Sequence, residues 1–453
     1  MAPVTRRQAA MASGIDTHGV RAQAIAPSSF RQGTKFGDHE LQPAAPIYEI
    51  DRAIGIPVYE IDLSLAPRER YKPLARRFQA EMRRLTRVLD ELLESDLFLH
   101  KWAIVAIKKA GKVLLRQVYS NEETEELRGI CDITGVDMYL LVIFNVLLDC
   151  LMGCTSGAVK AQEQKESASM MHFRTLDWGM DDLRKVVVQL NFVAKPDGDV
   201  IASSITYAGF VGVLTGVRRD LSMSLNFRPN HNNSTSIFSN ARYLLHCAMV
   251  LFGRQPSISH VLRNYLIPPY AGPRGHTESK ETSHPTLATV IRDLPQIPTT
   301  ACYLTFSDGI QTFVLEKDRT TAEIRSSESF ITITNHDVSS EQQITSNSSS
   351  HSQQDTSPNP IGYVAGWIAE STDRRTCLER LWDDAKDKAA RKLLRGELGD
   401  IAIKVRVVKE WMRKWPISNE CTHFWCLMDP KTGTVRYAEM YEEPIEEPEK
   451  MDG

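Results

Sequence analysis

The sequence has no run of apolar residues long enough to cross a bilayer. Its most apolar stretch, residues 138–152, is interrupted by Asn145 and Asp149 and is shorter than the roughly 20 residues that a membrane-spanning helix needs. We therefore expect a buried helix from Val136 to about Cys150.

The first thirty residues also lack the apolar core of a secretory signal. They carry several Arg and Ser but a single acid, Asp16, which leaves a mitochondrial presequence open, although a flexible tail is the favoured interpretation. Without a secretory signal, the favoured location is the cytoplasm and the default state of the cysteines is the reduced thiol.

The chain carries nearly equal numbers of basic and acidic residues. The 54 basic and 57 acidic residues give a formal net charge of -3, so the basic surface typical of nucleic-acid binders is missing and we exclude a nucleic-acid partner. The eight cysteines show neither the regular close spacing of a disulfide scaffold nor neighbouring Cys and His at zinc-site spacing. We accordingly expect no metal and no cofactor.

Composition divides the chain into segments. Residues 1–45 are rich in Ala, Ser, Gly and Pro and are expected to form a disordered tail. Residues 46–153 show mainly helical patterns, whereas residues 154–441 show strands. Within the latter, residues 336–360 are rich in Ser, Gln, Asn and Thr, which is typical of a disordered insertion, and residues 442–453 form an acidic tail.

Helical periodicity dominates the segment before residue 153. Between Leu74 and Ser95, apolar residues recur at steps of four and three, as on one face of an amphipathic helix. A second helical pattern covers residues 102–115. Ser120 and Glu123 form a capping box for a third helix near residues 122–131.

Strand patterns dominate the rest of the chain. Residues 59–65 alternate like a strand that ends before Pro67, and residues 185–193 and 200–207 form a predicted hairpin. Helices flanking long antiparallel runs favour an α+β fold. Further strands are expected at residues 222–228, 301–305, 312–316, 329–334, 422–428 and 434–441, and further helices at 239–251, 257–266 and 375–394.

One stretch carries the residues of a possible reaction centre. The apolar helix leads into Gly153-Cys154-Thr155-Ser156, and a later strand-like run contains Arg174 and Asp177, three residues apart. To act as a nucleophile, a cysteine thiol needs a cation that favours the thiolate and a group that orients the base that removes its proton. The pattern is a plausible frame for a cysteine nucleophile.

These residues resemble a known family. Gly-Cys-Thr-Ser, followed by Arg174-Thr175-Leu176-Asp177-Trp178-Gly179, is similar to the nucleophile strand and the Arg-x-x-Asp-aromatic-Gly strand of the acid ceramidase and N-acylethanolamine acid amidase family. The resemblance is spread over most of residues 47–441. Further similar motifs lie at residues 59–67, 207–216, 225–226, 314–319, 334–337 and 373–375.

The resemblance implies an N-terminal nucleophile hydrolase. Such a protein has a four-layer αββα sandwich, here preceded by a helical small-subunit region, and its precursor cuts itself before the nucleophile. The resemblance therefore implies cleavage between Gly153 and Cys154, with the two fragments remaining associated.

The same resemblance implies roles for individual residues. Cys154 would supply both the thiol and the free α-amine, Asp177 would accept a hydrogen bond from that amine, and Arg174 would favour the thiolate. Asn335 would donate to the oxyanion, and Arg374 matches an active-site arginine of the family.

Each of these residues also has an ordinary structural interpretation. Cys154 could be a buried structural cysteine, and Arg174 and Asp177 a surface ion pair. Asn335 could end a strand, and Arg374 could be a solvated residue of a helix's first turn.

The resemblance implies an amidase of N-acyl lipids, with ceramide as the first substrate and N-acylethanolamines as the second. A penicillin or bile-salt type acylase is a more distant enzyme alternative, and a non-catalytic lipid-binding relative is the alternative of another class. Contact with a membrane surface is a further possible interaction.

The chain departs from the family pattern in two ways, one of which affects a polar contact and the other the expected cellular compartment. The family has an acid where this chain has Phe227, which puts one polar contact in doubt. Its lysosomal members join their subunits by a disulfide, but here Cys377 has no cysteine before Cys131 to pair with. The lysosome or vacuole is therefore the alternative to the cytoplasm.

Overall fold

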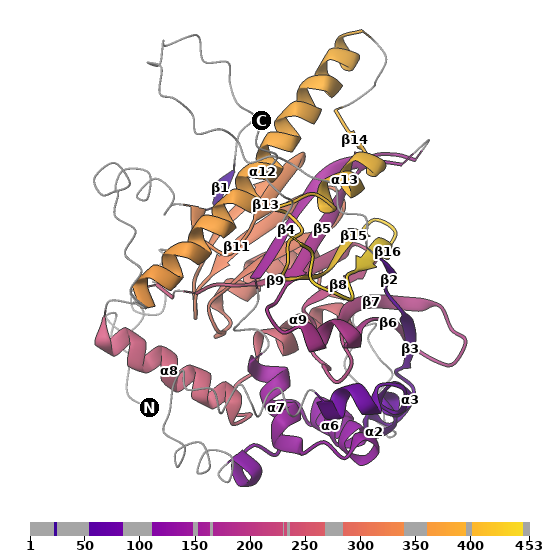
Figure 1. Cartoon of the computed structure of the whole chain (residues 1–453), viewed down its shortest axis with the longest axis vertical. Helices are drawn as coiled ribbons and strands as arrows, with labels where there is room; N and C mark the ends of the chain where they lie inside the picture. Colours follow the sequence, from indigo (N-terminus) through magenta and orange to yellow (C-terminus); the bar gives the residue numbers. More distant parts are fainter. Residues whose placement is uncertain are drawn as a thin grey trace, which may run out of the picture.

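Two packed β-sheets with helices on their outer faces form the protein (Figure 1). The computed structural model describes residues 22–24, 54–84, 111–147, 153–163, 166–229, 231–232, 236–267, 284–338, 360–395 and 401–446. Of residues 22–24 and 360–367 it describes the backbone alone.

The larger sheet has nine strands. Neighbouring strands are antiparallel except at the two edges, where β1 pairs with β12 and β3 pairs with β6 in parallel. Its order is β1 (Ala22–Ala24), β12 (Ala322–Ser327), β11 (Thr312–Lys317), β10 (Cys302–Ser307), β9 (Leu221–Phe227), β8 (Thr215–Arg218), β7 (Val200–Tyr207), β6 (Val187–Val193) and β3 (Val58–Asp62).

The second sheet has seven strands and carries Cys154 near the start of β4. Its order is β13 (Phe330–Ile333), β4 (Gly153–Gln162), β5 (Ser169–Asp177), β15 (Thr422–Asp429), β16 (Thr434–Met440) and β2 (Ile54–Gly55), with β14 (Ile403–Lys404) paired to β4. The segment before Cys154 thus supplies an edge strand to each sheet.

The facing surfaces of the sheets are unusually polar. Strand side chains alternate between the two faces of a sheet. His172 of β5 therefore points to the other sheet, where its two ring nitrogens lie 2.9 Å from Ser222 Oγ and 2.8 Å from Ser224 Oγ. Phe173, its neighbour, points outwards into an apolar cluster with Leu378 and Trp411.

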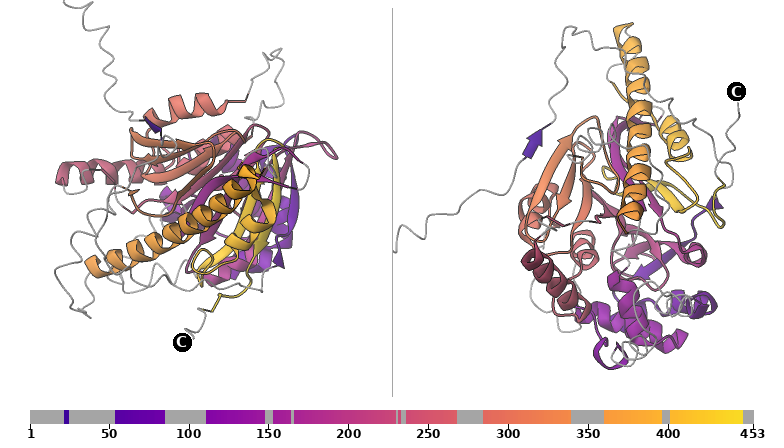
Figure 2. Two further views of the ribbon diagram at one scale, coloured as in Figure 1. Left: turned by 90° about the horizontal axis from the view of Figure 1, so that it is seen from above. Right: turned by 60° about the vertical axis from the view of Figure 1, so that its left-hand side comes forward.

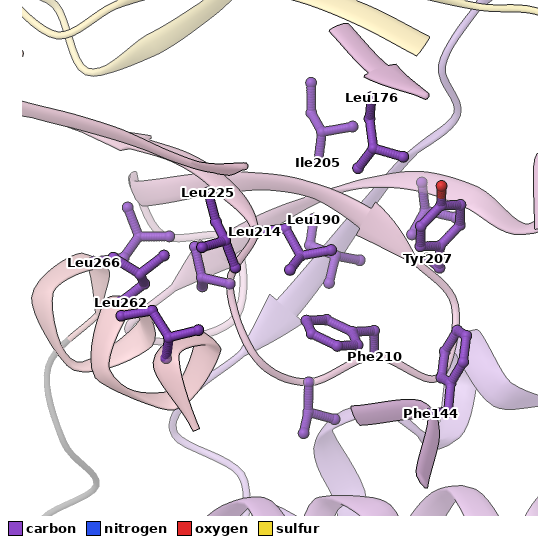
Figure 3. Close-up of a cluster of buried hydrophobic side chains, with 14 of the residues drawn as sticks. Phe144, Leu176, Leu190, Ile205, Tyr207, Phe210, Leu214, Leu225, Leu262 and Leu266 are labelled. Atoms are coloured by element: carbon purple, nitrogen blue, oxygen red, sulfur yellow. The ribbon is translucent and has the colours of Figure 1, made fainter. Parts of the chain in front are cut away.

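Helices cover both outer faces. On the second sheet lie α12 (Pro360–Leu394) and α13 (Val405–Met412). On the larger sheet, Leu262 and Leu266 of α9 (Ile258–Leu266) pack with Leu214 and Leu225 (Figure 3), next to α10 (Leu287–Asp293). The α+β class is therefore confirmed, in the layer order helix, sheet, sheet, helix (Figure 2).

The remaining helices gather at one end of the sheets (Figures 1 and 2). They include α2 (Pro67–Arg70), α3 (Lys72–Arg77), α6 (Asn121–Thr134) and α7 (Met138–Leu147), while α8 (Ile237–Leu251) runs alongside. The predicted cap of α6 is confirmed, since Ser120 Oγ accepts a hydrogen bond from Glu123 N. Residues 181–186 and 294–296 form short 3-10 helices.

Several predicted boundaries need correction. The helix expected at residues 375–394 begins earlier, at Pro360. The predicted insertion at residues 336–360 begins too early, because His336 is buried and Asp337 pairs with Arg228; residues 339–359 lie outside the described part. The helix expected from Leu74 is interrupted at Phe78, and its residues 85–95 lie outside the described part.

His172 allows a test of the polar interior. Burial, with a smaller contribution from Arg174, lowers the pKa of His172 to about 3. Since an unfolded histidine titrates near 6.5, only the unfolded chain takes up this proton between pH 6.5 and 3, and stability falls as the pH falls through that window. Between pH 6.5 and 5, His172 should remove roughly 2 kcal/mol from the free energy of unfolding.

We therefore expect His172→Gln, in a Cys154→Ala background that keeps one chain, to lose less stability than its parent over this range. Urea unfolding at several pH values measures the difference. Equal pH slopes in the two proteins would contradict the assigned histidine.

Candidate functional site

Cys154 lies between the two sheets. Its side chain is fully buried, and its thiol accepts a hydrogen bond from Arg174 Nη2 at 3.1 Å. Its backbone N–H donates to Asn335 Oδ1 at 2.7 Å. Burial raises the pKa of the Cys154 thiol, whereas the positive charge of Arg174 opposes that rise.

Arg174 reaches the thiol from the adjacent strand. It occupies the inward face of β5, opposite Ser156 in the strand register, and is itself fully buried. Its Nη1 donates to the carbonyl of Leu225 at 2.6 Å, which anchors the guanidinium to β9 of the other sheet. The guanidinium therefore contacts both sheets in the interior, so the interpretation of Arg174 as part of a surface ion pair is wrong.

Arg374 contacts two of the other predicted site residues. From α12, its Nη2 donates to Asn335 Oδ1 at 3.0 Å and its Nη1 donates to Asp177 Oδ2. The side chain is mostly buried, so the interpretation as a solvated first-turn residue is wrong. The structure thus brings together all five predicted site residues: Cys154, Arg174, Asp177, Asn335 and Arg374.

The side-chain amide of Asn335 contacts Cys154, Arg374 and the backbone of β9. Its Nδ2 donates to the carbonyl of Phe227 at 2.8 Å, and its Oδ1 accepts from Cys154 N and Arg374. One hydrogen of Nδ2 is thus taken by Phe227, and since an amide nitrogen carries two hydrogens, the oxyanion role stays a prediction. In this arrangement Asn335 orients the backbone nitrogen of Cys154.

Asp177 flanks the peptide bond before the nucleophile. It pairs with Gly153 in the β4–β5 register, and Thr422 Oγ1 donates to its Oδ1 at 2.7 Å. A β-carbon at Gly153 would lie 3.3 Å from Asp177 Cβ and 3.6 Å from Arg374 Nη1, so a larger residue here would press on Asp177. The Cys154 N–H is directed to Asn335 and not to this carboxylate.

Three contacting residues were not among the predicted site residues. Asn226 accepts from Ser156 Oγ at 2.6 Å and donates to the carbonyl of Thr334 at 3.1 Å, so it joins β9 to both β4 and the end of β13. Ser371 accepts from Asn335 N at 2.7 Å, and Thr422 fixes Asp177. The similar Leu225-Asn226 motif was a signal for Asn226; single Ser and Thr residues gave none.

A pocket opens over the Gly153 side of this cluster. Its wall contains acidic residues together with the cation of Arg374. Burial raises the pKa of Glu370, whereas the positive charge of Arg374 lowers it. A polar wall of this kind suits an amide or amine better than an acyl chain. Its lining residues are Gly153, Asp177, Trp178, Gly179, Asn335, Glu370, Arg374, Asn419, Glu420 and Cys421.

Across the described ranges, no group of three or more His, Cys, Asp and Glu side chains is arranged to hold a metal ion. In the same part of the chain, no helix combines the length and apolarity needed to span a membrane.

Parts of the chain are similar to known proteins. Residues 55–119 match a family model described as the beta subunit of N-acylethanolamine-hydrolyzing acid amidase. A probable acid ceramidase of Caenorhabditis elegans is 26% identical over 195 residues, covering 40% of this chain and 47% of that protein. The N-acylethanolamine-hydrolyzing acid amidase of Oryctolagus cuniculus is 28% identical over 165 residues, covering 36% and 42%. Over these parts, the chain is similar to members of the acid ceramidase and N-acylethanolamine acid amidase family.

The extent of these matches is limited. The alignments span less than half the length of the two relatives, at 47% and 42%. A solved structure, the Caenorhabditis elegans N-acylethanolamine-hydrolyzing acid amidase ortholog, is similar with 19% identity and a TM-score of 0.39, covering 61% of this chain and 93% of that one. The fold assignment therefore depends on the sheets and helices of this chain itself.

The structure shows the surroundings of Phe227 and Cys377, the two positions at which the chain departs from the family pattern. Phe227, which replaces the family's acid, contributes its backbone carbonyl to Asn335, so this position still takes part in the hydrogen-bond network. Cys377 is buried in α12 and free.

Thr422 offers a test of how Asp177 is held. Thr422→Val should lower the free energy of unfolding by about 1–3 kcal/mol, because a buried carboxylate oxygen loses its donor. Thr422→Ser keeps the hydroxyl and should restore most of that loss. Chemical denaturation measures both, and equal stability of the valine and serine variants would contradict the assigned hydrogen bond.

Proposed function

We propose that this protein hydrolyses the amide bond of N-acyl lipids, with Cys154 exposed by self-cleavage as its N-terminal nucleophile. The observation that carries the proposal is the pair of contacts at Cys154. Its thiol is 3.1 Å from a buried guanidinium nitrogen, and its backbone nitrogen is 2.7 Å from Asn335 Oδ1. Both atoms that an N-terminal nucleophile must use are therefore oriented before any cleavage.

The first step converts the precursor. The Cys154 sulfur attacks the carbonyl carbon of Gly153, and the peptide nitrogen of Cys154 leaves after taking up the thiol's proton. The thioester formed between Gly153 and the sulfur is then hydrolysed by water, which yields a Gly153 carboxylate, a free thiol and a free α-amine. Asn335 Oδ1, 2.7 Å from that nitrogen, holds the leaving group in place.

The second step repeats this chemistry on a substrate. The α-amine, with a reference pKa near 8, takes the thiol proton, and the thiolate attacks the acyl carbonyl. The C–N bond breaks, the amine product leaves with the proton, and water hydrolyses the acyl thioester. Arg174 stabilises the thiolate, while Arg374 holds Asn335 and Asp177 in register.

Ceramide is the first substrate in this proposal and N-acylethanolamines are the second. The similarity to a probable acid ceramidase and to an N-acylethanolamine-hydrolyzing acid amidase supports both, and the polar pocket beside Gly153 suits a hydroxylated amine portion. A penicillin or bile-salt type acylase uses the same nucleophile. A non-catalytic lipid-binding relative is disfavoured by the complete set of buried site contacts.

The relatives' names also bear on location. They describe an acid ceramidase and an acid amidase, which favours an acidic compartment such as the lysosome or vacuole. The cytoplasmic expectation gains no support. Contact with a membrane surface would give such an enzyme access to lipid amides.

Cleavage is tested by mass spectrometry of the purified protein at mildly acidic and neutral pH. We expect two fragments that meet between Gly153 and Cys154. Cys154→Ala should remain one chain and lose amidase activity. Cleavage of the alanine variant at the same bond, or turnover by it, would contradict the mechanism.

A panel of amides tests the substrate. We expect the processed protein to give its highest kcat/KM with ceramide, a lower value with an N-acylethanolamine, and much lower values with penicillin and a glycine-conjugated bile salt. Fatty-acid release measured by chromatography provides the comparison. Fast penicillin or bile-salt hydrolysis would overturn the lipid assignment, and a processed protein that hydrolyses none of the four would overturn the amidase.

A further inference from the structure

Cutting before Cys154 would leave an upstream fragment that is built into both sheets. Its β3 pairs with β6 at one edge of the larger sheet, and its β2 pairs with β16 at one edge of the second. These strands are short, and edge strands exchange partners more easily than central strands. Retention of the upstream fragment therefore needs a stronger contact.

The strongest candidate is a buried group of charges between α6 and α9. Glu126 of the upstream fragment is fully buried and receives two hydrogen bonds from Arg263 of the downstream fragment, at 2.7 Å to each carboxylate oxygen. Arg70, also upstream and buried, donates to the same carboxylate at 2.9 Å. Paired, bidentate charges of this kind are the strong type of charge-assisted hydrogen bond.

Neighbouring contacts cross the same boundary. Asn145 of α7 donates to the carbonyl of Gly209 at 2.9 Å and accepts from the N–H of Val211 at 2.8 Å. Within the downstream fragment, Arg263 also donates to the carbonyl of Val211 at 2.5 Å. Between these bonds, Phe144 packs edge-on against Phe210 (Figure 3).

These contacts connect the boundary to the reaction centre. Phe144 also contacts Tyr207, which lies in the same apolar cluster as Leu176 (Figure 3). Leu176 is the residue opposite Cys154 in the strand register. Loss of the upstream fragment would therefore open the core beside the nucleophile.

Resting on the function proposed above, we propose that the Glu126–Arg263 pair, completed by Arg70, is the lock that retains the upstream fragment after self-cleavage. No disulfide performs this task among the described cysteines, since none of the seven forms one. Because the pair is buried, salt should weaken it little. Removing Glu126 takes away the carboxylate that both arginines contact, and removing Arg263 leaves that buried carboxylate with Arg70 of its own fragment alone. The intact chain tolerates either loss better, because its two parts cannot diffuse apart.

The test does not depend on self-cleavage. In a Cys154→Ala background, a site for a sequence-specific protease is inserted between Leu147 and Gly153, and the purified chain is nicked with that protease. Fragment release over time is then measured by size-exclusion chromatography. The parent should stay a two-fragment complex, also in 1 M salt.

Glu126→Gln and Arg263→Gln should each release the fragments about 100-fold faster once nicked. Both variants should elute as compact single chains before nicking, which separates release from misfolding. In the double variant the two effects should not add, because the residues act as a pair. Asp132→Asn, which removes an exposed ion pair to Arg68 within the upstream fragment, is the matched control and should leave release unchanged.

Release by the Glu126 and Arg263 variants at the parent's rate would overturn the lock, as would rapid separation of the nicked parent. If either single variant does not fold as an intact chain, Arg263→Lys, which keeps the charge and loses the bidentate geometry, replaces it in the same assay. Failure of the native chain to cut itself would overturn the proposed function and leave this measurement unaffected.

Discussion

The hydrogen bond from Arg174 to the Cys154 thiol is the contact on which the rest of the site depends. Burying an arginine is costly unless its charge and its N–H groups find partners. Here the partners come from both sheets: the thiol on β4, the carbonyl of Leu225 on β9 and, at 3.5 Å, Asn226 Oδ1. The two sheets must therefore pack in one register, and the polar residues between them follow from this requirement.

A second arginine connects that interior to the helical layer. Arg374 holds Asp177 and Asn335 together, while Ser371, one helical turn earlier in α12, receives the N–H of Asn335. The packing of α12 on the second sheet thus sets the geometry at Cys154, although the helix itself contributes no reacting atom. A change that shifts α12 would disturb the orientation of the nucleophile's nitrogen before it disturbs the thiol.

Part of this arrangement could be predicted from the sequence because its signals are local. Arg174 and Asp177 follow the nucleophile by one strand connection, and strand alternation and the Ser120 cap gave elements close to those observed. Asn335 and Arg374 lie far from Cys154 in the chain and were found only through the family resemblance. Nothing in the sequence pointed to Thr422 or Ser371, because the hydrogen-bond partner of each hydroxyl lies more than 35 residues away in the chain.

The errors have physical reasons as well. His336 and Asp337 were assigned to a polar insertion on composition, yet the ion pair to Arg228 and the contact with Ser371 fix both residues. The elements β8, β12 and α13 were also missed.

The central claim is that the sulfur of Cys154 becomes acylated while its nitrogen is a free amine. The most direct measurement is an acid quench during turnover of a labelled N-acyl amide, followed by peptide mass spectrometry. The account predicts a peptide that begins at Cys154 and carries the acyl group as a thioester that hydroxylamine removes. Acyl label on another residue would contradict it. An enzyme that turns over the substrate, begins at Cys154 and yet carries no acyl label would contradict it as well.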